Sequence, residues 1–458
     1  KWDQISPYNF LCPEINRIRT VTGCVATAVA ILMRYYQWPD VGTGTLPAYN
    51  YTAHINGREI AQTIPERTLG NTYAWNNMPL EYDWSSSEVT ENEVATLMYD
   101  CGVMAQAEFN IASAGGTGAA TLTAVRGLAE YMKYDKSMLC LRREWYSDTE
   151  WIQMLENEIM TVGPVLYGGA TLSNEGHQFI LDAYTTENYF RVNWGWSGHS
   201  NGFFLISALN PNDQGAGGST GGGFIANQDA LFGLKPAKGN SNYQTLLGML
   251  AGKTGSGESY SGLITSETQF NVNTNFTVKC GFFWNLGLIP FSGKVALAIV
   301  DKNQNIRELI SGTSSISSMK TYGGMAFTFP CKISLSPQPG DRIVAVYKGT
   351  NDTDWKIVRG GPDTTNEIIV KTDPTPIIET EQETQFTVYC DKQQGTVIAH
   401  LPENSHTLNI YDVNGRLLRQ ILSEGKETIT FSCREYPTGV YILQVITDKG
   451  SQQCKFLK

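Results

Sequence analysis

Cys24 stands where a thiol could act as a nucleophile. It follows the turn residues Thr22 and Gly23 and opens a stretch in which small and apolar residues recur at helical spacing. We expect Thr22 to cap a helix over 23–36, which Pro39 prevents from continuing. In the first turn of such a helix the backbone N–H groups are unpaired and the dipole end is positive, so a thiol there ionises more easily. The alternative is a small buried hydrophobic residue, which is the commoner role of a free cysteine.

A histidine and an asparagine far downstream could complete the chemistry of this cysteine. His177 begins an apolar, strand-like run after a tight turn, and Asn193 and Trp194 end another such run. An imidazole can take the proton of a thiol, which gives a thiolate–imidazolium pair, while a third polar group holds the ring by its other nitrogen. Asn193 can hold the ring, and the Trp194 indole can shield that contact from water. The alternatives are a structural histidine, an asparagine bonded within its own turn and a core aromatic residue.

The elements that must position these side chains begin as helices and continue as strands. Helical spacing predicts further helices over 90–101, 119–134 and 149–162, the last with Thr149 as its cap. Apolar runs predict strands over 164–169, 177–184, 189–194, 203–206 and 230–234. The glycine-rich residues 213–223 predict a mobile loop between the last two strands. Helices followed by antiparallel strands predict an α+β domain over residues 1–236.

The sequence after residue 236 predicts strands and turns. We expect a linker over 237–242, a β-sandwich accessory domain over 245–372, a linker over 373–376 and a smaller β-sandwich over 377–458. Both sandwiches are expected to be immunoglobulin-like. Strands in the first are predicted at 268–272, 276–282, 294–300 and 342–347. The second is predicted to contain a strand from 408 that turns at Asn414-Gly415, and another over 438–445.

The amino-acid composition argues against several classes of binding partner. The formal net charge of -10 argues against nucleic acid or an anionic membrane as the main partner. Without a run of about 18 apolar residues, no membrane span is predicted. Nine cysteines without CxxC spacing and five histidines predict no metal site, and no cofactor is expected. Candidate disulfide pairs are Cys280 with Cys331 and Cys433 with Cys454. The chain opens on Lys1 without a signal peptide, as a processed product does.

Three motifs agree in order and spacing with those of a known family, namely 22–27, 176–182 and 192–198. With them go Gly202-Phe203-Phe204, Ala208-Leu209-Asn210-Pro211, Leu234-Lys235-Pro236 and the opening residues 4–9. Over residues 1–236 the chain therefore resembles the streptopain family of papain-like cysteine peptidases. The resemblance implies a papain-like fold and secretion as a zymogen whose N-terminal pro-segment is removed. It also implies endopeptidase activity on proteins and peptides, with an apolar side chain preferred at P2.

The resemblance further implies catalytic roles. Cys24 would be the nucleophile that forms an acyl-enzyme, and His177 would be the general base and acid. Asn193 would orient the imidazole, and Trp194 would shield it. All four residues stand in the matching motifs.

The oxyanion donor needs a separate assignment. Papain-like enzymes generally carry a glutamine six residues before the cysteine, where this chain has Ile18, which cannot donate. The resemblance assigns the role to Gln4, beside the backbone N–H of Cys24; the alternative is a solvated glutamine near a frayed terminus. Residues expected to bind substrate are Gly168, Gly169, Glu175, Gly176 and Trp196. Glu175 stands where relatives often have glycine, and its charge would alter substrate choice or raise the pKa of His177.

A second set of motifs lies at the end of the chain, over 410–416, 437–441 and 455–458. These residues resemble the C-terminal sorting domain of proteins exported by the type IX secretion system of Bacteroidetes. The resemblance implies contact with that secretion machinery and transport to the outer-membrane surface or the medium. The alternative is one more immunoglobulin-like module.

The sequence leaves three functions open. The first is a secreted cysteine endopeptidase with accessory β-modules. The second is a surface adhesin or binding protein whose peptidase domain is weak or inactive, for which Ile18 and Glu175 are the evidence. The third is an acyl- or amide-transferring enzyme, such as a transglutaminase, on the same cysteine–histidine scaffold.

Overall fold

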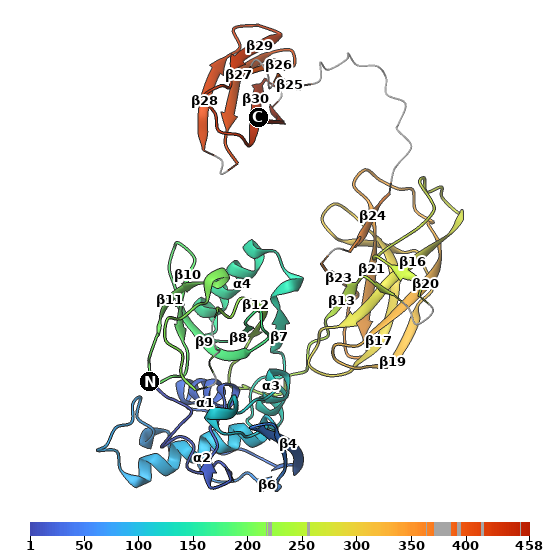
Figure 1. The fold of residues 1–458 in the computed structure, drawn as a ribbon. Coiled ribbons are helices and arrows are strands. Elements are labelled where there is room, and N and C mark those ends of the chain that lie inside the picture. The colour runs from blue at the N-terminus through green and yellow to red at the C-terminus, as the bar shows by residue number, and fades with distance from the viewer. Residues whose placement is uncertain are drawn as a thin grey trace. The chain divides into compact units, whose positions relative to one another are not determined.

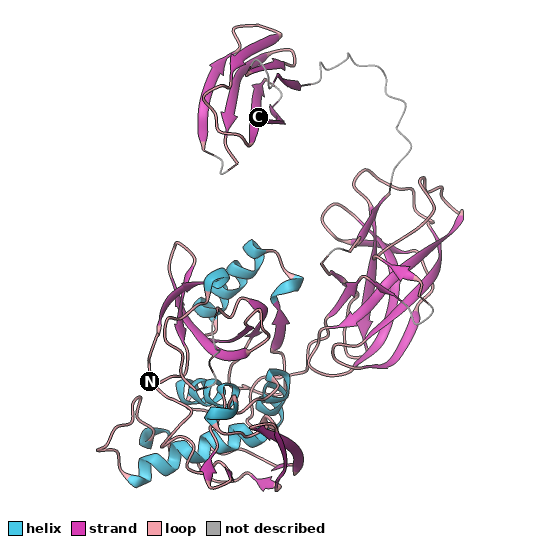
Figure 2. Ribbon diagram, in the orientation of Figure 1, coloured by secondary structure: helices cyan, strands magenta, loops and turns pink. Residues whose placement is uncertain are grey.

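The α-helices all lie before residue 162, and strands dominate the chain after them (Figure 1; Figure 2). The computed structural model describes residues 1–216, 218, 222–253, 257–362, 364–370, 386–391, 395–413, 416–448 and 450–458. The chain forms two compact units, Lys1–Thr372 and Asp373–Lys458. The described α-helices are α1 (Cys24–Tyr36), α2 (Glu88–Met104), α3 (Thr121–Glu130) and α4 (Asp148–Thr161). The helices that the sequence predicts are therefore all present.

A glycine and a serine, rather than the predicted threonines, precede two of these helices. Gly23 is the N-cap of α1 with a φ of 90°, and no side chain accepts a hydrogen bond there. The hydroxyl of Thr22 contacts a threonine inside the helix instead. The cap of α4 is Ser147, which accepts from the first turn, and not Thr149. Because no side chain occupies them, the N–H groups in the first turn of α1 stay available beside Cys24.

A six-stranded antiparallel sheet completes this part of the chain, in the order β11-β10-β9-β8-β12-β7. Its strands are β7 (Leu139–Arg142), β8 (Val165–Ala170), β9 (Gly176–Tyr184), β10 (Tyr189–Asn193), β11 (Gly202–Leu205) and β12 (Ala226–Phe232). Gln178 pairs with Gly168, Gly168 with Asp229, and Asp229 with Arg142. Because directly opposed residues share a face of a sheet, these four residues form one cross-strand row over β9, β8, β12 and β7.

Helices cover both faces of the sheet. Leu166, Ile180 and Leu231 share a buried core with α1, α2 and α3, whereas Trp151 and Leu155 of α4 belong to a second core on the other face. Side chains alternate between the faces of a strand. The side chains of the cross-strand row therefore lie on the same face of the sheet as those of the first core. This is the face that α1 covers.

Two further sheets pack face to face over residues 247–369. One sheet contains β13 (Leu247–Leu250), β16 (Asn275–Asn285), β20 (Gly324–Lys332) and β23 (Arg359–Gly360). The other contains β17 (Phe291–Val300), β18 (Ile306–Leu309), β19 (Ser314–Met319), β21 (Arg342–Gly349), β22 (Lys356–Ile357) and β24 (Glu367–Ile369). One core joins side chains of both sheets. The strand predicted at 268–272 is wrong, because these residues form bends and a turn, although Phe270 still packs against Phe276 with ring centroids 5.1 Å apart.

This sandwich packs against the helical part within the same compact unit. Arg359 donates to the carbonyl oxygen of Trp145 at 2.7 Å and to the carboxylate of Glu150 at 2.6 Å. We propose to treat 1–236 and 245–372 as separate domains because each has its own sheets and core. The contacts of Arg359 nevertheless join them into one unit.

The second unit contains two smaller sheets around one core. Its strands are β25 (Thr387–Asp391), β26 (Thr396–His400), β27 (Ser405–Tyr411), β28 (Leu417–Leu422), β29 (Thr428–Ser432), β30 (Val440–Thr447) and β31 (Gly450–Leu457). The predicted linker over 373–376 and the turn at Asn414-Gly415 lie outside the described residues. The immunoglobulin-like character of both sandwiches stays a prediction.

The nine cysteines lie in described residues, and each carries a free thiol. The candidate pairs Cys280–Cys331 and Cys433–Cys454 are therefore wrong. The predicted loop at 213–223 lies partly outside the described residues, and its described part contains neither helix nor strand. Among the helices that the structure describes, none has the length and hydrophobicity that a membrane span requires.

Candidate active site

Cys24 and His177 line one cavity of about 540 Å³, which we call the cleft. The start of α1 and the segment 115–121 form one side of the cleft, and residues of β8, β9 and β12 form the other. The fold thus brings together the two residues that the sequence singled out for nucleophilic chemistry.

The thiol of Cys24 is held between a helix start and the strand that carries the histidine. Cys24 is partly exposed. Burial of the sulfur raises the pKa of the thiol, whereas hydrogen bonds from the backbone N–H groups of Gln178, Val25 and Cys24 itself act in the opposite direction. Burial therefore opposes the easier ionisation that the helix start favours for this thiol. Its proton must leave through a neighbouring base when the sulfur reacts.

His177 is buried and held by a backbone atom. Its Nε2 lies 2.9 Å from the carbonyl oxygen of Trp194. Because a carbonyl only accepts hydrogen bonds, Nε2 carries a proton, and Nδ1 is the nitrogen that can take another in the neutral ring. The backbone contact thus leaves Nδ1 as the atom at which the neutral ring could act as a general base.

The side-chain oxygen of Asn193 bonds within its own loop, and the predicted role of Asn193 in orienting the histidine stays a prediction. Its side-chain oxygen accepts from the N–H of Gly195 at 3.2 Å and lies 3.5 Å from the amide nitrogen of Asn201. Both contacts stay within the loop after β10, so the asparagine shapes the loop. The residue after it, Trp194, supplies the carbonyl that contacts His177.

Trp196 covers the imidazole more closely than Trp194 does. The ring centroids of Trp196 and His177 are 4.5 Å apart at an interplanar angle of 24°, against 6.2 Å for Trp194. Trp196 is buried and its indole donates to the carbonyl of Ala216 at 3.0 Å. Trp196 therefore stacks on the histidine and is not among the described residues that line the cleft, and its predicted contact with substrate stays a prediction.

Gln4 is buried close to the reactive cysteine rather than solvated at a frayed end. The backbone carbonyl of Gln4 accepts a hydrogen bond from the N–H of Thr22 at 3.0 Å. Thr22 lies two residues before Cys24 along the chain. Its side-chain Nε2 donates to the carbonyl oxygen of Ala216. Ile18 lies half-exposed on the short strand β2 (Ile18–Arg19). Gln4 is thus near the site, with its amide bonded to another group.

Three of the predicted substrate-binding residues line the cleft, namely Gly168, Gly169 and Gly176. Glu175 is not among the described residues that line it. Its carboxylate accepts from the hydroxyl of Ser173 at 3.2 Å in the turn before β9. Its predicted influence on the pKa of His177 stays a prediction.

Two side chains that the sequence analysis missed lie over Gly168. A Cβ at residue 168 would lie 2.5 Å from Asp229 Oδ1 and 2.5 Å from Gln178 Oε1. The hydroxyl of Thr121, on the other side of the cleft, donates to Gln178 Oε1 at 2.8 Å. Burial raises the pKa of Asp229 to about 6, although the Gln178 amide and Arg142 oppose the rise. Pairing of separate strands creates this arrangement, so no local pattern marks it.

Two family models match parts of the chain. Residues 2–204 match the model of the Peptidase C10 family, and residues 387–458 match that of the secretion system C-terminal sorting domain. Residues 2–204 belong to the peptidase C10 family. The sorting-domain match indicates secretion or attachment to the cell surface.

Relatives of this C10 domain include two curated proteases. The thiol protease/hemagglutinin PrtT of Porphyromonas gingivalis is 34% identical over 237 residues, which are 52% of this chain and 26% of that protein. Streptopain of Streptococcus pyogenes is 33% identical over 251 residues, which are 51% of this chain and 60% of that protein. The chain thus spans about a quarter of the length of the first and 60% of the second. The solved structure of active interpain A cysteine protease from Prevotella intermedia is 32% identical, with a TM-score of 0.43, over 51% of this chain and 91% of that one.

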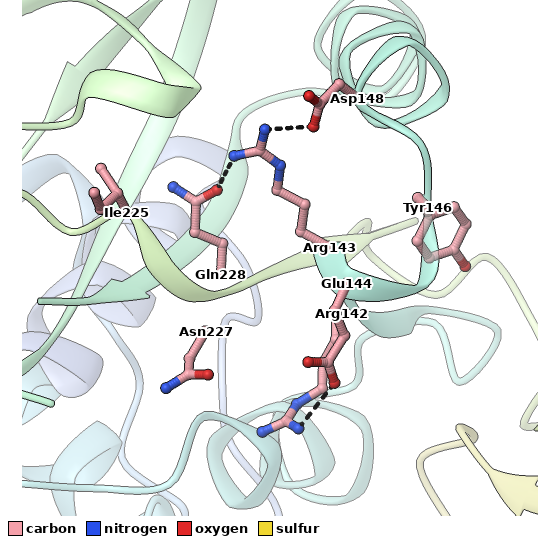
Figure 3. Close-up of a pocket in the computed structure, with 8 residues that line it drawn as sticks. All are labelled: Arg142, Arg143, Glu144, Tyr146, Asp148, Ile225, Asn227 and Gln228. Atoms are coloured by element: carbon pink, nitrogen blue, oxygen red, sulfur yellow. Dashed lines mark hydrogen bonds and ion pairs between the residues drawn. The ribbon is translucent and has the colours of Figure 1, made fainter. Parts of the chain in front are cut away.

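A second cavity of the C10 domain, of about 400 Å³, adjoins the cleft and shares Arg142 and Asn227 with it. Figure 3 shows Arg143 between the carboxylate of Asp148, at 2.7 Å, and the side-chain oxygen of Gln228, at 2.5 Å. Its described lining contains no cysteine, serine or histidine. The candidate chemistry of the C10 domain therefore belongs to the cleft.

Proposed function

We propose that the protein is a secreted cysteine endopeptidase. The observation that carries this proposal is the cleft that Cys24 and His177 share, with the imidazole oriented by the carbonyl oxygen of Trp194. Membership of residues 2–204 in the peptidase C10 family supports the same reaction.

In the proposed reaction the thiol of Cys24 gives its proton to Nδ1 of His177 as the sulfur attacks the carbonyl carbon of the scissile peptide bond. His177 then passes the proton to the leaving amine, the C–N bond breaks, and a thioester acyl-enzyme remains. A water molecule that gives a proton to His177 attacks the thioester. The C–S bond breaks, the carboxylic acid product leaves, and Cys24 regains its proton. Transfer of the thiol proton at the moment of attack suits a thiol whose pKa is raised by burial.

The oxyanion would accept hydrogen bonds from the backbone N–H of Cys24 and from the side-chain amide of Gln4. For this to happen, Nε2 of Gln4 must exchange the carbonyl oxygen of Ala216 for the substrate oxygen. Burial of Gln4 beside Thr22 supports the assignment, since it leaves the amide little freedom to lose on binding.

The C-terminal unit is proposed to direct export through contact with the type IX secretion machinery, as its sorting-domain match suggests. Removal of an N-terminal pro-segment stays a prediction. The preference for an apolar side chain at P2 also stays a prediction, and the polar lining of the cleft points to another selection, which is argued below.

An active-site probe tests the proposal. The full chain is treated with limiting iodoacetamide or an epoxysuccinyl peptide, and labelling of each cysteine is measured by mass spectrometry. We expect rapid labelling of Cys24 that is lost in His177→Ala, together with cleavage of peptide substrates that is lost in Cys24→Ala. The other half-exposed cysteines, Cys390 and Cys454, serve as internal controls.

Three outcomes distinguish the candidate functions. Labelling of Cys24 no faster than that of Cys390 or Cys454, without peptide cleavage, supports the adhesin alternative. Incorporation of an amine into glutamine-containing substrates without cleavage supports a transferase. Either result rejects the endopeptidase.

A further inference from the structure

Asp229 is a carboxylate among the residues that line the cleft. Asp229 lies on β12, directly opposite Gly168 of β8, which in turn lies opposite Gln178 of β9. Because residue 168 has no side chain, Asp229 and Gln178 reach toward each other over it, and a Cβ there would meet both. The carboxylate thus lies in a gap that a single glycine opens.

This gap lies next to the reacting sulfur. The backbone N–H of Gln178 forms a hydrogen bond with the sulfur of Cys24, while the side chain of Gln178 lies beside Asp229 over Gly168. Gln178 therefore lies beside both the nucleophile and the carboxylate, and all three residues line the same cleft.

Asp229 forms no salt bridge within the described residues, although Arg142 opposes the rise of its pKa. Its Oδ1 is buried and has no hydrogen-bond partner there. The neighbouring amide of Gln178 carries no charge and is itself held by Thr121. A buried carboxylate without a partner charge is costly, and a bound cation removes that cost.

Arg142 is the nearest candidate for such a cation, but it is engaged elsewhere. Its guanidinium pairs with the carboxylate of Glu144 at 3.3 Å and lies 5.1 Å from the ring centroid of Tyr322, on the sandwich. Arg142 and Asp229 both line the cleft, whereas Glu144 lines the second cavity. Because Arg142 is paired with Glu144, it forms no salt bridge with Asp229.

We propose that Asp229 binds the cationic side chain of a substrate lysine or arginine that lies close to the scissile bond. This inference rests on the proposed function, and it concerns one of the three substrate residues before the scissile bond. Gly168 provides the space, and Thr121 fixes Gln178 so that the space stays open.

The test compares matched peptides with the full chain. A set of internally quenched peptides carries lysine, arginine or isoleucine in turn at each of the three positions before the scissile bond. We expect lysine and arginine to exceed isoleucine in kcat/KM at one of these positions. In Asp229→Asn this advantage should fall by about 10- to 100-fold, the range of a hydrogen bond to a charged group, while cleavage of the isoleucine peptide is retained.

Two further variants keep the result interpretable. Glu187→Gln removes one negative charge from the exposed turn after β9 and should leave the lysine-to-isoleucine ratio unchanged. Asp229→Glu keeps the charge and should keep a preference for lysine, even if Asp229→Asn folds poorly.

A ratio that Asp229→Asn does not change, or a wild-type preference for isoleucine at all three positions, overturns the inference while the endopeptidase function stands. Failure to cleave any peptide, with Cys24 no more reactive than the other thiols, rejects the proposed function and this inference with it.

Discussion

The imidazole of His177 is held by a main-chain atom, the carbonyl oxygen of Trp194, 2.9 Å from Nε2. A side-chain substitution cannot delete this contact. It can orient the ring while the side-chain oxygen of the neighbouring Asn193 bonds within its own loop. The residues around the histidine therefore fall into two groups, those that position the ring and those that only shape the loop.

The first prediction concerns Asn193. Its side chain bonds only within its own loop, so Asn193→Ala should lower kcat by less than about tenfold, whereas loss of a required orienting group in another enzyme costs about 10⁴. Steady-state kinetics with one peptide substrate measures both Asn193→Ala and His177→Ala. Loss of activity in Asn193→Ala equal to that in His177→Ala would show that the amide acts on the ring.

The second prediction concerns the stack of Trp196 on His177. Because Trp196 is buried and its ring lies 4.5 Å from the imidazole, Trp196→Ala should cost about 3–5 kcal/mol of unfolding free energy. Trp196→Phe keeps an aromatic face and should recover most of the labelling of Cys24 by iodoacetamide. Denaturant unfolding and the labelling rate are the two measurements. Equal labelling in both variants would contradict a role for the aromatic face.

The third prediction concerns the gap at Gly168. A methyl group there would lie 2.5 Å from both Asp229 and Gln178, so Gly168→Ala must displace one of them. We expect kcat/KM for the lysine peptide to fall by at least about tenfold, with little change in the labelling rate of Cys24. A parallel loss of both would mean that the substitution disturbs the nucleophile itself.

The fourth prediction concerns pH. The pKa of Asp229 is raised by burial to about 6, so its carboxylate gains charge as the pH rises from 5 to 7. The ratio of lysine to isoleucine cleavage should increase over that range, and Asp229→Asn should abolish the increase. Cys140 and Tyr322 also face this carboxylate, but burial raises their pKa values, so they stay neutral there, and Arg142 stays charged. Titration of the catalytic pair affects both peptides and cancels in the ratio.

The same pKa has a consequence for stability with a definite sign. An acid whose pKa is higher in the folded state than its ordinary value of 3.8 destabilises the fold once it ionises. That cost appears as the pH rises from about 4 to 6 and is complete at pH 7. Asp229→Asn should therefore raise the unfolding free energy at pH 7 by roughly 2–3 kcal/mol and change it little at pH 4. A destabilised variant at pH 7 would show that the carboxylate supports the fold.

The fifth prediction concerns the docking of the sandwich. Arg359 bonds to the carbonyl of Trp145 and to Glu150, and Arg359→Ala should cost about 1–3 kcal/mol in a fragment of residues 1–372. A fragment of residues 1–236 contains Cys24, His177 and Asp229 and should cleave peptides, but with a lower Tm than residues 1–372. Thermal unfolding of the three proteins measures this. Equal Tm values would mean that the domains do not stabilise each other.

Local patterns were sufficient to predict the elements that carry the reaction. The apolar spacing after Cys24 predicted α1, and apolar runs predicted the strand that begins near His177 and the strand that ends at Asn193. These elements form because their own residues favour them, so sequence periodicity finds them.

The parts that could not be predicted depend on contacts between distant segments. Burial, which no local pattern reports, raises the pKa of Cys24 above what the helix start alone would give. The carbonyl of Trp194, and not the side chain of Asn193, meets the histidine because of the path of the loop. The site over Gly168 arises only when β9, β8 and β12 pair in register.

β12 enters the sheet between β8 and β7, and it carries Asp229 beyond residue 204, where the match to the C10 family ends. The segment that defines the family therefore holds the nucleophile and its base, while the carboxylate proposed to choose among substrates comes from the chain that follows. The proposed reaction and the proposed selection of substrates therefore depend on different stretches of the chain. An expression fragment trimmed to the family boundary would lack β12, an inner strand of the sheet, and with it Asp229.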